Sequence, residues 1–221
     1  MGECRNTAIV LAAGQGKRMH SKIQKQFMEL DGMPVLCYSL RCFQESPLIR
    51  DVILVTGEEY VSWCREEIVE KYGFTKVSAV VSGGKERYDS VFAGLKAASG
   101  CDYVLIHDGA RPFLEQACLD RLCQCLSEHD ACLLTVPCKD TIKVIEEGRI
   151  KETPNRSQLV QAQTPQAFKT SLILRAYRKA RQEKVQATDD AQVVELLTGE
   201  AVYAVLGSYK NIKITTQEDL R

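Results

Sequence analysis

Short runs of apolar residues alternate along the chain with stretches in which apolar side chains recur at helical spacing. The continuous apolar runs are typical of strands buried on both faces of a sheet, and they cover residues 7–12, 51–56, 77–82, 103–107 and 131–137. The amphipathic stretches between them predict helices over roughly 34–44, 59–71, 86–98 and 115–128. Since alternating strands and helices form βαβ units, the pattern predicts one α/β domain over residues 1–221, with a mostly parallel sheet.

The alternation changes after Pro137. Residues 138–161 hold two short β-like runs around Glu147 and Gly148, which predicts a hairpin that projects from the sheet as an arm. Because exposed strand edges favour association, the arm also predicts contact with a second copy of the chain. Further along, the pattern predicts helices at 169–181 and 189–198, strands at 201–206 and 211–215, and a final helix capped by Thr215 or Thr216.

Charge and composition narrow the function classes. Among the 221 residues, 29 Lys and Arg balance 29 Asp and Glu, which argues against a nucleic-acid or membrane-surface protein. No apolar run approaches the ~20 residues of a membrane span. The N-terminal apolar segment is too short for a secretory signal, and the 10 cysteines form no C-x-x-C pair. We therefore expect reduced thiols in a cytoplasmic protein.

The segment after the first strand, LAAGQGKRMHSKIQKQF, combines small residues with cations. Small residues let backbone N–H groups approach a phosphate, and the cations add charge. The residues concerned are Ala12, Ala13, Gly14, Gly16, Lys17, Arg18 and Lys25. A dinucleotide fingerprint would need glycine in place of Met19, and a P-loop would need Ser or Thr in place of Arg18. The segment predicts a phosphate site, with an ordinary turn and solvated charges as the alternative.

Two further strand ends carry candidate chemistry. At SGGKERYDSV, Gly84 allows close approach to a base or ribose, and Arg87 and Ser90 share one helical face; a simple turn explains the segment equally well. At HDGARPF, Asp108 is placed to hold Mg²⁺ and Gly109 permits close approach, since ligands bind beyond the carboxyl ends of such strands.

In the same segment Arg111 offers an anion-binding fork. The alternative for HDGARPF is a buried Asp–Arg pair that only shapes the loop. The remaining candidates are dispersed and matter only if they converge on one pocket. They are Asp140–Thr141, Arg156, Thr164–Gln166, Thr188–Asp190 and Asn211–Lys213.

Eight segments, in the order AAGQGKRM, KQF, GGKERYDSV, HDGARP, DTIK, TPQAF, TDDA and NIKIT, resemble the 2-C-methyl-D-erythritol 4-phosphate cytidylyltransferases of the non-mevalonate isoprenoid pathway. They span nearly the whole chain. The resemblance implies a Rossmann-like, mostly parallel nucleotidyltransferase domain and a homodimer with interlocking β-arms. It also implies transfer of CMP from CTP to the sugar-alcohol phosphate, with Mg²⁺ or another divalent cation.

The resemblance assigns roles by position. Arg18 and Lys25 would stabilise the transition state at the α-phosphate of CTP, helped by Lys213. Contacts to CTP would come from Ala12, Ala13, Gly14, Gly84, Ser90 and Asp108, and we add Gly16, Arg87 and Gly109 as neighbours of that site. The acceptor phosphate would be positioned by Arg156 from the partner's arm, Thr164, Thr188 and Lys213, with Thr141 nearby and Arg111 as a further anion contact.

Some positions depart from the family pattern, namely Gln24, Gly109 and Val160, and none of them removes a charged group. Three other functions fit the same architecture. They are a ribitol 5-phosphate cytidylyltransferase, a sugar-1-phosphate uridylyl- or guanylyltransferase, and a non-catalytic nucleotide-binding module.

Overall fold

Seven strands form one central sheet in a computed structural model that describes residues 5–14, 24–98 and 100–220, and their order is β11-β7-β10-β6-β1-β4-β5. The strands are β1 (Asn6–Ala12), β4 (Asp51–Thr56), β5 (Val77–Ser82), β6 (Tyr103–Asp108), β7 (Ala131–Pro137), β10 (Val160–Lys169) and β11 (Tyr203–Leu206). Every neighbouring pair is parallel except those that involve β10, which runs antiparallel to both β6 and β7. The predicted α/β class with a mostly parallel sheet is confirmed.

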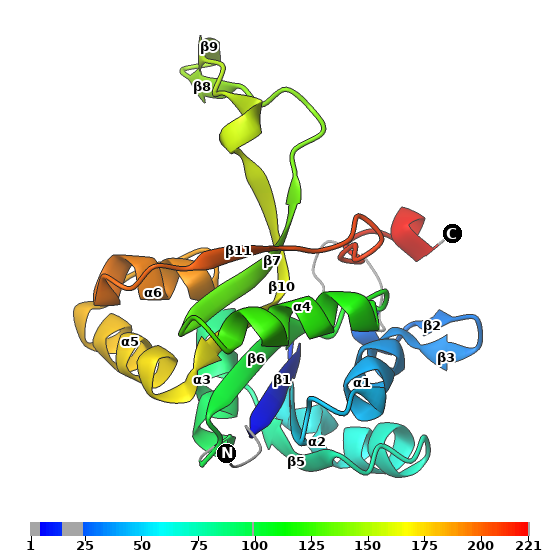
Figure 1. Cartoon of the computed structure of the whole chain (residues 1–221). Helices are drawn as coiled ribbons and strands as arrows, with labels where there is room; N and C mark the ends of the chain where they lie inside the picture. Colours follow the sequence, from blue (N-terminus) through cyan, green and yellow to red (C-terminus); the bar gives the residue numbers. More distant parts are fainter. Residues whose placement is uncertain (1–4, 15–23, 99, 221) are drawn as a thin grey trace.

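Helices cover both faces of this sheet (Figure 1). One core lies between the sheet and helices α1 (Val35–Glu45) and α4 (Gln116–Leu126). The other is formed with helices α3 (Arg87–Ala97), α5 (Thr170–Glu183) and α6 (Asp190–Thr198). Successive β1 side chains supply opposite cores, because strand side chains alternate between faces: Val10 packs in the first core and Ile9 in the second.

The helix predicted over 59–71 is irregular. A 3₁₀ turn at Glu58–Tyr60 leads into the short helix α2 (Val61–Trp63), which continues as a π-helical segment at Cys64–Glu70. Cys64 and Ile68 still bury against the first core, so the apolar stripe predicted from the sequence has its expected place.

Two expectations for the C-terminal part are wrong. Strand β10 was not predicted, because its centre carries polar residues and Pro165. Residues 211–215 form no strand, although their alternating pattern is typical of one. The segment after Thr215 and Thr216 is a 3₁₀ turn, Gln217–Leu220. Here Asp219 accepts hydrogen bonds from both threonine backbone N–H groups, which lower the pKa of its carboxyl to about 2.

The predicted hairpin is present between β8 (Val144–Glu146) and β9 (Arg149–Glu152). Its turn residues Glu147 and Gly148 both have positive φ, as tight hairpins require. Figure 1 shows it at the tip of an extension that stands away from the sheet beyond β7 and β10. All residues of β8 and β9 are exposed. A smaller hairpin joins β2 (Glu29–Leu30) to β3 (Met33–Pro34).

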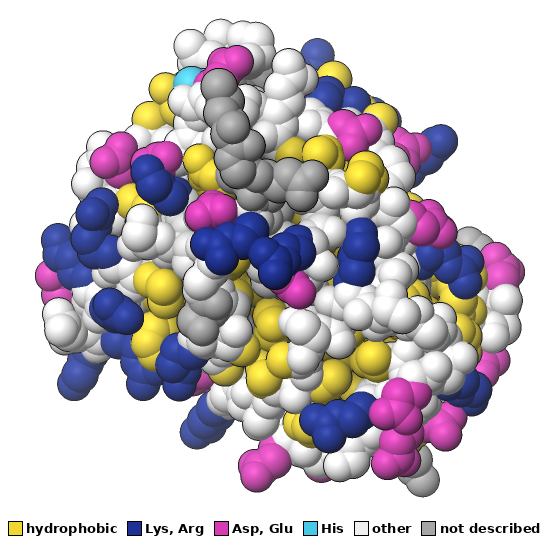
Figure 2. All heavy atoms as spheres, turned by 60° about the horizontal axis from the view of Figure 1, so that its bottom comes forward, with side chains coloured by type: hydrophobic (Ala, Val, Ile, Leu, Met, Phe, Trp, Pro, Cys, Tyr) yellow, Lys and Arg dark blue, Asp and Glu magenta, His cyan; other side chains and the backbone are white. Residues whose placement is uncertain are grey.

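Surface and thiol properties agree with the zero net charge. On the face drawn in Figure 2, Lys and Arg side chains lie in small groups beside Asp and Glu. In the described part of the chain, no helix is long and apolar enough to cross a membrane. Burial raises the pKa of the Cys37 and Cys42 thiols to about 12, so both remain protonated, inert parts of the core.

Candidate active site

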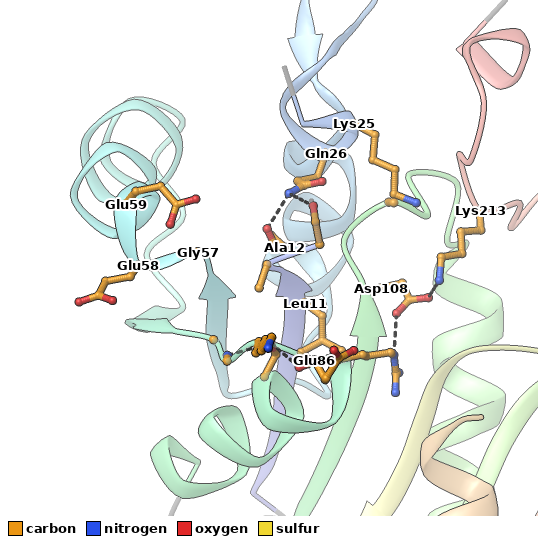
Figure 3. Close-up of a pocket in the computed structure, with 18 residues that line it drawn as sticks. Leu11, Ala12, Lys25, Gln26, Gly57, Glu58, Glu59, Glu86, Asp108 and Lys213 are labelled. Carbon is orange, nitrogen blue, oxygen red and sulfur yellow. Dashed lines mark hydrogen bonds and ion pairs between the residues drawn. The ribbon is translucent and has the colours of Figure 1, made fainter. Parts of the chain in front are cut away.

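A cavity of about 460 Å³ opens at the carboxyl ends of β1, β4, β5 and β6 (Figure 3). Its lining comes from the loops that follow these strands and from the segment near residue 213. The lining residues are Leu11, Ala12, Ala13, Gly14, Lys25, Gln26, Gly57, Glu58, Glu59, Gly83, Gly84, Lys85, Glu86, Arg87, Ser90, Asp108, Ala110 and Lys213. Predicted residues from five separate sequence segments therefore converge on one cavity.

Asp108 is the buried carboxylate of this cavity, and two cations flank it. Lys213 Nζ lies 2.7 Å from Oδ2, and Arg87 Nε lies 3.5 Å from Oδ1. Burial alone would raise the pKa of Asp108, but Arg87 and Lys213 hold it well below its usual range. Asp108 is therefore ionised at neutral pH. Figure 3 shows Lys25 and Lys213 pointing toward this carboxylate from the same side.

Hydrogen bonds to neighbouring loops hold Lys213 in place, although it belongs to no strand. The Ile214 N–H donates to Ala110 O (2.9 Å), and Lys25 Nζ donates to Ile214 O (2.9 Å). Arg111 Nη1 donates to Asn211 O at 2.7 Å. These contacts fix the segment against the β6 loop, so two predicted catalytic lysines are held through one peptide unit.

A buried hydrogen-bond chain supports Asp108 from behind. Thr164 Oγ1 lies 3.0 Å from His107 Nδ1 and accepts from the Asp108 N–H at 3.1 Å. Burial lowers the pKa of His107 to about 4, so its ring is neutral. His107 Nε2 faces Arg111 O at 3.3 Å and must carry the proton, since a carbonyl only accepts. The Thr164 hydroxyl then donates to Nδ1, which leaves it 5% exposed and fully bonded.

Gly84 and Ser90 meet where the loop after β5 enters α3. A Cβ on Gly84 would overlap the Asp89 side chain, so glycine is required for this close approach. The Gly84 N–H donates to Ser90 Oγ at 3.2 Å, and Ser90 Oγ donates to Glu86 O. The hydroxyl thus fixes the shape of this cavity wall.

Gln26 is a functional residue that sequence reasoning missed. It is 2% exposed, and its Nε2 donates to Ala12 O (2.6 Å) and Gly14 O (3.2 Å), which shapes the predicted phosphate loop. Its position between Lys25 and Phe27 was the one available signal. The predicted loop residues Gly16 and Arg18 lie outside the described residues.

Acidic residues at the other end of the cavity were also missed. Glu58 and Glu59 follow β4 directly, and Figure 3 shows them across the cavity from Lys25 and Lys213. The rule that ligands bind beyond strand ends could have identified them. The cavity is therefore polarised, with its cations gathered around Asp108.

Five predicted residues do not line the cavity. Gly109 faces inward, where a Cβ would meet Leu36 and the Leu11 carbonyl, and Arg111 is bonded to Asn211 behind the site. The other three lie on exposed segments, and they are Thr141 and Arg156 on the arm and Thr188 before α6. Their predicted contacts to substrate stay predictions.

Arg111 shows why burial decides its role. Burial lowers the pKa of its guanidinium, and Nε is buried without a hydrogen-bond partner among the described residues. The alternative of a loop-shaping Asp–Arg pair fits in part, because the Arg111 N–H donates to Asp108 O at 2.9 Å. Its side chain points to the segment of Asn211 instead of to the Asp108 carboxylate.

Comparison with known proteins gives a consistent result. A family model described as 2-C-methyl-D-erythritol 4-phosphate cytidylyltransferase matches residues 6–221. The chain is 47% identical to the protein of that name from Geotalea uraniireducens, over 98% of this chain and 94% of the relative. It is 49% identical to the one from Lachnoclostridium phytofermentans, over 97% and 92% of the two chains.

Solved structures agree. The crystal structure of 4-diphosphocytidyl-2C-methyl-D-erythritol synthase from Anaerococcus prevotii superposes with a TM-score of 0.87 at 35% identity, over 99% of this chain and 93% of that one. The 2-C-methyl-D-erythritol 4-phosphate cytidylyltransferase from Francisella tularensis gives a TM-score of 0.82 at 27% identity, over 98% and 96%.

Proposed function

Because the chain belongs to the 2-C-methyl-D-erythritol 4-phosphate cytidylyltransferase family, we propose that it transfers CMP from CTP to 2-C-methyl-D-erythritol 4-phosphate and releases pyrophosphate. Members of this family are nucleotidyltransferase enzymes of isoprenoid precursor synthesis. The observation that carries the proposal is the cavity itself, in which Lys25, Arg87 and Lys213 surround the ionised Asp108 at the carboxyl edge of the sheet.

The proposed chemistry needs charge stabilisation more than a nucleophilic side chain. An oxygen of the acceptor phosphate attacks the α-phosphorus of CTP, the new P–O bond forms, and the bond to the pyrophosphate oxygen breaks. The attacking phosphate is already ionised at neutral pH. Two anions must approach, so Lys25 and Lys213 lower the repulsion, and their fixed positions avoid reorganisation during the step.

We propose Mg²⁺ as the divalent cation and Asp108 as its protein ligand. Mg²⁺ prefers hard oxygen ligands and is held by one or two carboxylates plus substrate phosphates. The residues fit this pattern: Asp108 is a single ionised carboxylate, and the described chain holds no group of three or more His, Cys, Asp or Glu side chains suited to a metal. When bound, Mg²⁺ would supply positive charge at the triphosphate.

We further propose a homodimer in which the arm of one copy reaches the site of the other. Apolar residues on the arm are exposed, including Ile145 at 70% and Ile150 at 65%, which favours burial against a partner. Arg156 is exposed, and its Nη1 donates to Lys139 O at 2.6 Å within the arm. A second copy would bring this guanidinium to the acceptor phosphate.

The reaction is tested by pyrophosphate release with CTP and Mg²⁺. We expect release with 2-C-methyl-D-erythritol 4-phosphate and little with ribitol 5-phosphate. Release with ribitol 5-phosphate alone would replace the acceptor and keep the mechanism. Release with neither acceptor, while CTP still binds, would point to the nucleotide-binding module; release with UTP or GTP and a sugar 1-phosphate would change the base.

Mixing two inactive variants tests the shared site. Arg156→Ala and Lys213→Ala remove groups assigned to different copies of the dimer. If Arg156 acts on the partner, random re-association restores roughly a quarter of wild-type activity, since half the dimers are mixed and each has one intact site. A mixture as inactive as its components would place both residues in one copy's site.

We place the enzyme in the cytoplasm, where thiols remain reduced. The support is chemical: burial raises the pKa of Cys132 as well as that of Cys64, so these thiols persist as packed core groups.

A further inference from the structure

Asp190 is a fully buried carboxylate next to the cavity, and none of the roles assigned above uses it. It is 0% exposed and opens helix α6. Arg87 contacts both of its oxygens, with Nη1 at 2.9 Å from Oδ1 and Nη2 at 2.7 Å from Oδ2. The Tyr177 hydroxyl donates to Oδ1 as well. This is a bidentate pair of fixed geometry.

Three elements hold Asp190 in position. Tyr177 comes from α5 and is itself 1% exposed, with its ring stacked on Tyr88 at 4.5 Å between centroids. From β10, Gln166 accepts from the Ala191 N–H and donates to the Asp189 carboxylate, both at 2.9 Å. The start of α6 is therefore anchored to the sheet, and Asp190 cannot follow a moving partner.

Arg87 lies between two carboxylates and treats them unequally. Its two terminal nitrogens are engaged by Asp190, so only Nε faces Asp108, at 3.5 Å. The other cation on Asp108 is different, because the Lys213 side chain is 35% exposed and ends a single flexible stem. Burial alone would lower the pKa of Arg87, but Asp190 raises it above its ordinary value, so the charge is permanent.

We infer that Asp190 is a positioning residue that restrains Arg87 and so keeps Asp108 available to a divalent cation bound with a nucleoside triphosphate. Without this restraint, Arg87 would close on Asp108 in a bidentate pair and occupy both oxygens that the cation needs. Lys213 is the cation that can leave Asp108 for a phosphate, whereas Arg87 stays. The inference rests on the proposed function.

The decisive variant is Asp190→Asn. The amide keeps nearly the same shape, but it has no charge and offers one acceptor oxygen in place of two. Arg87 then loses its main partner while Asp108 remains within reach. The matched control is Asp189→Asn, one residue earlier, whose carboxylate contacts Gln166 and the Gln192 N–H and not Arg87.

The measurement is CTP binding by calorimetry, without acceptor, at low and high Mg²⁺. The readout is the ratio of the two Kd values, which reports the coupling between the cation and the nucleotide, and it is independent of turnover. We expect Asp190→Asn to reduce this ratio by about tenfold, within the usual range of such couplings, and Asp189→Asn to leave it at the wild-type value. Thermal unfolding checks that each variant is folded.

A second-site change separates restraint from a merely structural role. In Asp190→Asn with Arg87→Gln, no guanidinium remains to close on Asp108, so we expect the Kd ratio to return toward wild type. A general loosening of the site would not be rescued by removing a second charged group. If Asp190→Asn fails to fold, Tyr177→Phe loosens Asp190 more gently and should reduce the ratio at least about twofold.

Two outcomes overturn different claims. A wild-type Mg²⁺ effect that is unchanged in the folded Asp190→Asn and Tyr177→Phe variants overturns the inference alone. A wild-type protein that binds CTP equally well with and without Mg²⁺ overturns the proposed role of Asp108 and, with it, this inference.

Discussion

The carboxyl edge of the sheet and the projecting arm use charged residues in opposite ways. At the sheet edge, Asp108 and Asp190 are buried, and Arg87 joins them. On the arm, every residue of β8 and β9 is exposed, and Lys151 pairs with Glu146 in water at 3.0 Å. The first arrangement is screened little by solvent, and the second is screened strongly.

This difference teaches where a single chain can fix a functional geometry. Lys213 is held by contacts from several loops, so its ammonium has one position relative to Asp108. Arg156 has a partner only within the arm, namely the Lys139 carbonyl, among the contacts of the described residues. A precise role for Arg156 therefore requires a surface that the arm does not supply, which is why we propose a second copy.

The largest expected effect is at the sheet edge. Lys213→Ala should lower kcat by about 10²–10³-fold, the range for losing one preorganised charged donor at a transition state. Pyrophosphate release under saturating CTP measures it. Lys210→Ala is the matched control, because that lysine is three positions away with its side chain 79% exposed. Equal losses in both variants would contradict a specific role for Lys213.

The same substitution in the two regions should differ sharply in stability. Ile106→Ala in β6 removes a side chain that is 0% exposed, so unfolding should become easier by about 2–5 kcal/mol. Ile150→Ala on the arm removes a side chain that is 65% exposed and should change stability by less than about 0.5 kcal/mol. Urea unfolding compares them. Similar costs would mean that the arm is part of the core.

Association is expected to depend on the arm alone. Placing a charge at both exposed isoleucines, in Ile145→Asp with Ile150→Asp, should weaken dimer formation at least about tenfold, because each aspartate would be buried without a partner. Sedimentation over a concentration series measures the shift, and circular dichroism should show an unchanged fold. An unaltered dimer, or a wild-type monomer, would reject the arm as the interface.

The smallest effect is expected for the surface ion pair. Lys151→Ala removes the contact to Glu146 and should change Tm by less than about 2 °C, since exposed pairs contribute little. Differential scanning calorimetry is sufficient. A larger shift would show that the tip of the arm is packed against something, and would sharpen the case for a second copy.

Local patterns in the sequence predicted most of the fold. The apolar runs that became β1, β4, β5, β6 and β7 are recognisable because strands buried on both faces need continuous apolar residues. Strand β10 escaped notice because Gln163, Thr164 and Gln166 are polar and yet buried. Their partners come from distant segments, so no local rule identifies them.

The sequence by itself determined the α/β alternation, the hairpin at Glu147–Gly148 and the order of the loops that line the cavity, because each depends on nearby residues. Only the tertiary structure decided which charges meet. Arg87 and Asp190 stand 103 residues apart, and the pair exists because α3 and α6 pack on the same face of the sheet. Such pairing depends on how helices and strands are placed in space, and spacing along the chain carries no record of it.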